Sequence, residues 1–155
     1  MALTLSHGGD TIFSTASRSQ EVLVGTKEGI VFMKRNAGGS GWSVTRRALP
    51  DKHIHAVIIE PDSGAIIAGV TEDTIYVSED DGQTWERRDD GITQPDIYSL
   101  AAAKVNGKTR ILAGTQPAHL FYSDDLGRNW IELTALRSVD TSDWTFPGPP
   151  HVAHT

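Results

Sequence analysis

The segment Ser78-Glu79-Asp80-Asp81-Gly82-Gln83-Thr84-Trp85 is the most informative part of the chain for its architecture, because it recurs as Ser123-Asp124-Asp125-Leu126-Gly127-Arg128-Asn129-Trp130. Both copies follow the pattern S-x-D-x-G-x-[TN]-W, and their tryptophans are 45 residues apart (130 − 85), as are their serines. Repeats with a period of about 40–50 residues are typical of propeller blades and solenoid units. The sequence therefore predicts that one supersecondary unit is used several times.

A strand-like apolar run ending in glycine precedes each copy of this eight-residue pattern, which we call the box. Residues 66–69 and 111–114 both place this glycine 16 residues before the tryptophan. A third copy precedes them, in which residues 22–25 lead to Trp42, 17 residues on. Counting back from Trp42 puts Arg35 at the serine position, so we interpret the first box as degenerate.

Each unit is predicted to form four short strands separated by turns, because β-rich runs alternate with turn-forming residues. No segment shows a sustained helical period. The inner runs are almost continuously apolar, which is typical of strands covered on both faces. The expected strands of the second unit are 54–60, 65–70, 74–78 and 84–88, those of the third are 97–104, 109–115, 119–123 and 129–133, and 11–16 is a weaker candidate for the opening strand of the first.

These strands indicate an all-β fold, and a β-propeller of four-stranded antiparallel blades is the expected architecture. The whole chain, 1–155, is predicted to be one partial propeller of about three blades plus the start of a fourth. The expected parts are blade I at about 11–47, blade II at about 53–89, blade III at about 96–134, a proline-rich loop at 134–150 and the start of blade IV at 151–155.

The repeated box resembles the Asp-box, or BNR repeat, of sialidase-like β-propellers in the WD40/YVTN/BNR-like group. The resemblance implies that the box is a structural turn between the third and fourth strands of a blade, away from any catalytic face. Glycine accepts the positive φ that a tight turn often needs, serine and aspartate bond turn amides, and tryptophan anchors the turn. The residues expected in these roles are Ser78, Asp80, Gly82 and Trp85 in one box, and Ser123, Asp125, Gly127 and Trp130 in the other.

Two other interpretations of the box carboxylates stay open. Clustered oxygen donors suit Ca²⁺, although neither box has the spacing of an EF-hand loop. A glycosidase needs two carboxylates flanking one bond, and equivalent turns on neighbouring blades would not bring them together. We predict no metal and no cofactor.

Composition limits the possible partners and compartments. The chain has 155 residues, no cysteine and a net charge of −6, with a pI near 5.4. This charge argues against nonspecific binding to nucleic acid or anionic membranes. The sequence shows neither a signal peptide nor an apolar run of about 18 residues, so no membrane span and a cytoplasmic location are expected. The pairs Arg46-Arg47 and Arg87-Arg88 fall on expected outer strands, where we predict solvated side chains.

The length predicts an incomplete ring, since propellers usually close with four to eight blades. His151-Val152 looks like the opening of a fourth inner strand, and the chain ends at Thr155. The chain therefore resembles the N-terminal part of a longer propeller; the alternative is a half-propeller that closes by association. In both cases missing blades or self-association must cover exposed apolar faces and strand edges.

Histidines near the starts of inner strands are the main chemical candidates. His53 and His55 are two residues apart on an expected strand, so their side chains point the same way. His151 would hold the position equivalent to His53, and Asp96 and Tyr98 share the same location in the next blade. These residues either form a ligand or metal site in the central channel or are polar groups at its wet mouth.

The proline-rich loop carries two aromatic residues without an expected core position, Trp144 and Phe146. They either contact a protein partner or pack over the next blade. We expect a noncatalytic scaffold that binds a protein or a small ligand. The alternative is a fragment of a sialidase-like glycosyl hydrolase whose catalytic residues lie in blades not encoded here. The resemblance implies an arginine triad and an Arg-Ile-Pro segment in such an enzyme, and the nearest match, at 47–50, is poor, so the prediction leans against an enzyme.

Overall fold

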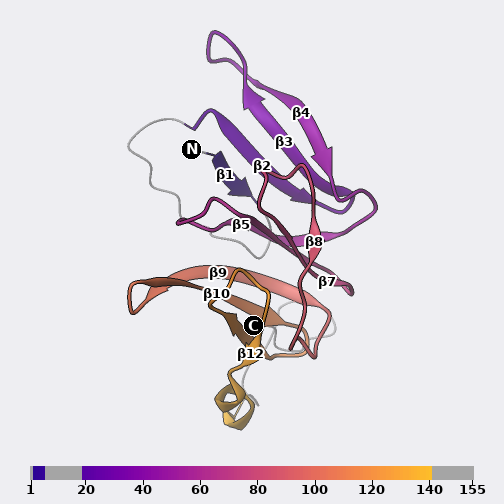
Figure 1. Ribbon diagram of the computed structural model, residues 1–155. Helices are drawn as coiled ribbons and strands as arrows, with labels where there is room; N and C mark the ends of the chain where they lie inside the picture. The colour runs from indigo at the N-terminus through magenta and orange to yellow at the C-terminus, as the bar shows by residue number, and fades with distance from the viewer. Residues whose placement is uncertain (1, 6–18, 141–155) are drawn as a thin grey trace.

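The structure is a computed structural model that describes residues 2–5 and 19–140. It confirms the all-β prediction: these residues form three four-stranded sheets that follow one another along the chain (Figure 1). The only helical segment in the described ranges is a 3-10 turn, η1 (Thr134–Ser138), where the proline-rich loop was expected to begin. Those ranges also include no helix long and apolar enough to cross a membrane.

The second and third sheets are antiparallel throughout, with their strands in sequence order. All eight strands expected in these two units are present, and the outer strands are shorter than expected because the box turns occupy their first residues. The second sheet consists of β5 (Ile54–Ile59), β6 (Ile66–Val70), β7 (Thr74–Ser78) and β8 (Glu86–Arg87), and the third of β9 (Ile97–Val105), β10 (Lys108–Thr115), β11 (Leu120–Ser123) and β12 (Ile131–Glu132).

The first sheet departs from the expected antiparallel pattern. Its first strand, β1 (Ala2–Leu5), pairs in parallel with β2 (Glu21–Thr26), and β3 (Gly29–Arg35) and β4 (Trp42–Ala48) complete the sheet. A parallel neighbour needs a connection of about a dozen residues or more, and 15 residues, 6–20, separate β1 from β2 in the sequence. The opening strand expected at 11–16 lies outside the described residues.

The strand register corrects the alignment of the degenerate first box. Val22 pairs with Met33 as Ile66 pairs with Ser78, so Met33, not Arg35, stands where a box serine would be. Trp42 pairs with Arg35 at the far end of a longer β3–β4 hairpin. Counting along the sequence failed here because this hairpin extends beyond the place where the box turns the chain in the other sheets.

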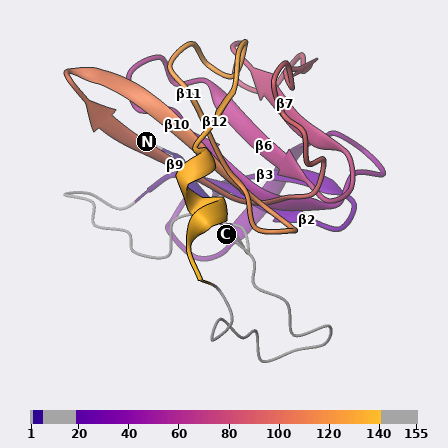
Figure 2. The same ribbon diagram turned by 90° about the horizontal axis from the view of Figure 1, so that it is seen from below.

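The second sheet lies between the other two (Figures 1 and 2), and β5 contacts both β2 and β9. Its central strand β6 is buried at every position, as the continuous apolar run predicts. Side chains alternate across the strand: Ile66, Ala68 and Val70 join an apolar cluster with the first sheet, and Ile67 joins a cluster with the third. Each interface between sheets is therefore an apolar core.

Candidate functional site

The box at 78–85 is a closed network of hydrogen bonds. The Ser78 hydroxyl accepts from the Gly82 amide at 2.7 Å and donates to Asp80 Oδ1 at 2.8 Å. Asp80 also accepts from the amides of Gln83 and Thr84, and from the Thr84 hydroxyl at 2.6 Å. These bonds, led by those from Thr84, lower the pKa of Asp80 to about 2.

The box at 123–130 repeats this geometry. Ser123 accepts from the Gly127 amide and donates to Asp125, both at 2.8 Å. Asp125 accepts from the Asn129 amide at 3.0 Å and from its side chain at 2.7 Å. Burial disfavours ionisation of Asp125, but the bonds from Asn129 outweigh it and the pKa is lowered. In both boxes the aspartate oxygens thus hold the turn together.

The two box tryptophans differ in burial. Trp130 is 4% exposed and lies in the cluster between the second and third sheets, where its Nε1 donates to the Arg88 carbonyl at 3.1 Å. Trp85 is half-buried against the cluster between the first and second sheets, and its Nε1 donates to the Gly82 carbonyl at 3.1 Å. Each ring therefore packs against the apolar cluster that its own sheet shares with the preceding sheet.

Four of the predicted channel residues gather at one end of the inner strands. His53 directly precedes β5, and its ring stacks on that of His55 with centroids 5.3 Å apart and planes 18° apart. The Tyr98 ring on β9 lies 4.3 Å from the His55 ring. Asp96 directly precedes β9, and its Oδ1 accepts from the Glu72 amide at 3.3 Å. Two neighbouring sheets thus contribute to one aromatic and polar group.

Hydrogen bonds orient this group. His55 Nδ1 lies 3.0 Å from the Thr71 hydroxyl, just after β6, and the Asp96 carbonyl accepts from the Gln116 amide at 3.0 Å. Among the described residues no three histidines, aspartates or glutamates gather closely enough to hold a metal ion. His151, Trp144 and Phe146 lie outside those residues. The group therefore offers stacked rings and hydrogen-bonding atoms.

The expectation of solvated basic pairs is wrong for Arg88. Its side chain is 7% exposed, pairs with Glu79 and Glu86, and donates from Nη1 to the carbonyl of Leu126. The signal in the sequence is weak, because an arginine beside a glutamate on a short strand is common on open surfaces. Only the third sheet, packed over this position, makes it buried. Arg87, the other member of the pair, is 55% exposed as expected.

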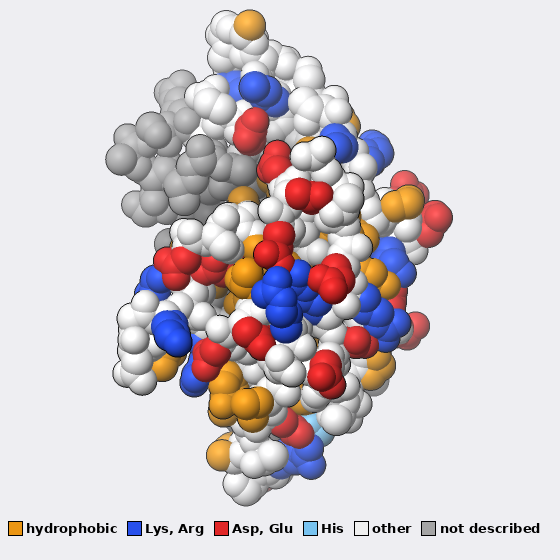
Figure 3. Space-filling view, in the orientation of Figure 1, with side chains coloured by type: hydrophobic (Ala, Val, Ile, Leu, Met, Phe, Trp, Pro, Cys, Tyr) orange, Lys and Arg blue, Asp and Glu red, His pale blue; other side chains and the backbone are white. Residues whose placement is uncertain are grey.

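Comparison with models of known protein families gives no match, and comparison with curated proteins gives none either. The resemblance to Asp-box proteins therefore stays a prediction from the repeated boxes. On the face in Figure 3, acidic and basic side chains are interspersed, so no large area of one sign suggests a highly charged partner.

Proposed function

We propose that the chain is part of an Asp-box β-propeller that acts as a noncatalytic scaffold for a protein or a small ligand. Three four-stranded sheets in chain order support this proposal, as do the two apolar interfaces between them. The box carboxylates Asp80 and Asp125 are engaged in turn hydrogen bonds, which is consistent with a structural role.

The observation that carries the binding function is the ring group of His53, His55 and Tyr98. In a closed propeller the inner strands surround the central channel, so their ends are where a ligand meets several blades. The two stacked imidazole rings and the tilted phenol ring provide apolar faces with polar edges, a combination that suits contacts with proteins or with small polar ligands. We therefore place the binding face at the beginning of β5 and β9.

Ring completion is the second part of the proposal. In the second sheet, Ile67, Ile75 and Val77 are 0%, 0% and 1% exposed, because the third sheet covers them. The matching positions in the third sheet, one repeat later, are Leu112, Leu120 and Tyr122, and all three are partly exposed. We propose that further blades or a second copy of the chain cover this face, as apolar sheet faces generally require.

The binding face is tested with immobilised peptides and oligosaccharides. Any ligand found is then titrated against the variant His55→Ala/Tyr98→Ala and against Ser40→Ala, an exposed control. We expect the double variant to lose binding and the control to keep it. Ligands that bind both variants equally would place the binding face elsewhere.

A further assay addresses self-association. Light scattering measures the molar mass in solution, and we expect a mass above the 16.8 kDa of one chain. A stable, soluble monomer would contradict self-association of this chain.

A further inference from the structure

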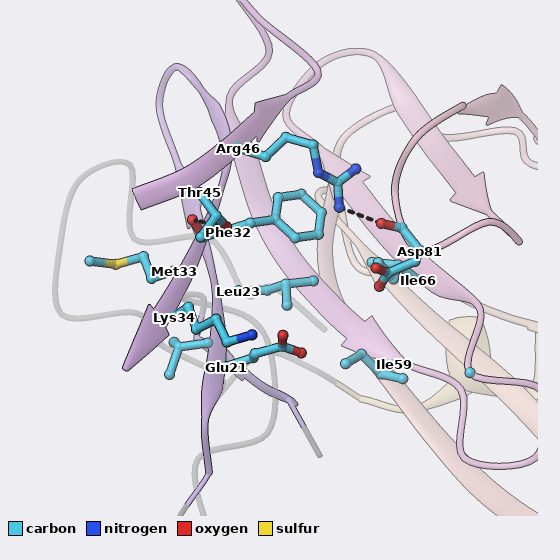
Figure 4. Close-up of a pocket in the computed structure, with 12 residues that line it drawn as sticks. Glu21, Leu23, Phe32, Met33, Lys34, Thr45, Arg46, Ile59, Ile66 and Asp81 are labelled. Atoms are coloured by element: carbon cyan, nitrogen blue, oxygen red, sulfur yellow. Dashed lines mark hydrogen bonds between the residues drawn. The ribbon is translucent and has the colours of Figure 1, made fainter. Parts of the chain in front are cut away.

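A cleft of about 360 Å³ opens between the first and second sheets (Figure 4). Leu23 and Phe32 form its apolar wall on the first sheet, and Ile59 and Ile66 form the wall on the second. Its charged side chains come from both sheets: Glu21, Lys34, Arg46 and Asp81. The cleft therefore combines an apolar interior with charges of both signs, and it is distinct from the ring group of His53, His55 and Tyr98.

The repeat shows how this cleft differs from the matching interface between the second and third sheets. Asp81 and Leu126 hold the same box position and the same backbone conformation, with φ of 59° in both. The carbonyl of each accepts a hydrogen bond from an arginine of the preceding sheet, Arg46 for Asp81 and Arg88 for Leu126. The Leu126 side chain packs against the core between the second and third sheets. At the interface between the first and second sheets the matching residue, Asp81, lines the cleft with a carboxylate instead.

A second departure from the repeat adds another carboxylate to the cleft. Val22 and Ile66 hold matching positions in the strand register, so Glu21 holds the position of Ala65. Ala65 is 2% exposed and belongs to the apolar cluster between the second and third sheets. Between the second and third sheets, the Asp62 carboxylate accepts hydrogen bonds from the side chains of Lys104 and Thr109. At this cleft carboxylates thus replace two apolar residues of the repeat.

The carboxylates of Glu21 and Asp81 approach the cleft from opposite sheets (Figure 4). Both residues are exposed, and neither forms an ion pair within the part of the chain that the structure describes. Lys34 stands opposite Glu21 in the β2–β3 register. Arg46 donates to the Asp81 carbonyl and lies 3.9 Å over the Phe32 ring, so protein contacts already hold it. The Asp81 carboxylate is left without a neutralising partner.

We propose that this cleft binds an organic cation: a ligand whose apolar body lies between the two walls and whose ammonium group lies between Asp81 and Glu21. Apolar surface supplies most of the affinity in such sites, and a few placed charges supply the orientation. The net charge of −6 also attracts cations to the molecule.

The test uses three matched probes: phenylbutylamine, phenylbutanol and phenylbutyrate. Each is titrated into isotopically labelled protein while amide chemical shifts are followed by NMR. We expect the amine to shift the amides of Leu23, Phe32 and Ile66 and to bind about two- to fivefold more tightly than the alcohol, as an exposed charge pair allows. The carboxylate should bind most weakly. Equal affinity of the amine and the carboxylate would overturn the assignment of a cation.

The variant Asp81→Leu introduces the residue that the chain itself uses at position 126, so it is expected to fold. It should fill the cleft and weaken binding of the amine and of the alcohol by roughly tenfold or more. Asp81→Asn should remove the preference for the amine and keep binding of the alcohol. Glu28→Gln, an exposed carboxylate outside the cleft, is the control and should bind like the parent. Amine binding that survives Asp81→Leu, or no shift at the cleft amides, would overturn the proposal and leave the scaffold function untouched.

Discussion

Arg88, directly after β8, donates from Nη1 to the carbonyl oxygen of Leu126 at 3.0 Å and so joins the second sheet to the third. Arg46 makes the corresponding bond to the carbonyl of Asp81 and joins the first sheet to the second. Both acceptors hold the same position in their boxes. The box is therefore a local turn and also the point at which the preceding sheet is attached by a charged donor.

Replacing Arg88 with methionine should destabilise the fold. The change leaves the partly buried Leu126 carbonyl without its donor, and we expect a loss of about 1–3 kcal/mol in the free energy of unfolding. Its partners Glu79 and Glu86 are 44% and 66% exposed, so water replaces much of what they lose. Urea denaturation measures the effect. The control is Arg87→Met, at an exposed site, and equal losses in the two variants would contradict the attachment role.

The two box tryptophans should respond differently to truncation. Trp130 is 4% exposed, and Trp130→Ala should cost about 3–5 kcal/mol, as large buried aromatic residues do. Trp85 is half-buried, so Trp85→Ala should cost clearly less. Denaturation of both variants under one condition tests the order. A larger loss for Trp85 would mean that the first interface, not the second, is the main source of stability.

The box serine should matter more than its small size suggests. Ser123 is 1% exposed, and Ser123→Ala leaves the buried Gly127 amide without an acceptor. An unsatisfied buried donor costs about 1–3 kcal/mol. The exposed Ser40→Ala serves as the control and should change stability by less than about 0.5 kcal/mol. The hydroxyl would have no such role if both variants unfolded at the same urea concentration.

Stability should fall in acid. The folded-state pKa of Asp80 is lowered to about 2, below its usual value. Its ionised form therefore stabilises the fold above the unfolded pKa of about 4, and this contribution is lost as the pH falls towards 2. Urea midpoints at several pH values should decline more steeply below pH 4 in the parent than in Asp80→Asn. Parallel curves for the two proteins would show that the Asp80 bonds do not favour the ionised form.

Much of the site geometry was predictable from local rules. The spacing of His53 and His55 placed their side chains on one face, and their rings stack as that spacing predicts. The contact between His55 and Tyr98 was expected only as a shared location, because it joins two sheets. The position of Trp42 was not predictable, since the β3–β4 hairpin is longer than the box-bearing hairpins. Local spacing cannot reveal such a change when the box pattern itself is lost.

Local sequence patterns are enough to predict the strands, their order in the second and third sheets, and the two box turns. These features depend on residues that are near neighbours in the chain, such as Ser78 and Gly82. Which side chains are buried between sheets depends instead on how one sheet packs on the next. Arg87 and Arg88 are adjacent and chemically identical, yet one is exposed and the other is buried, because burial depends on what the next sheet places over each position. The cleft beside Asp81 is likewise a tertiary feature, because its walls come from two different sheets.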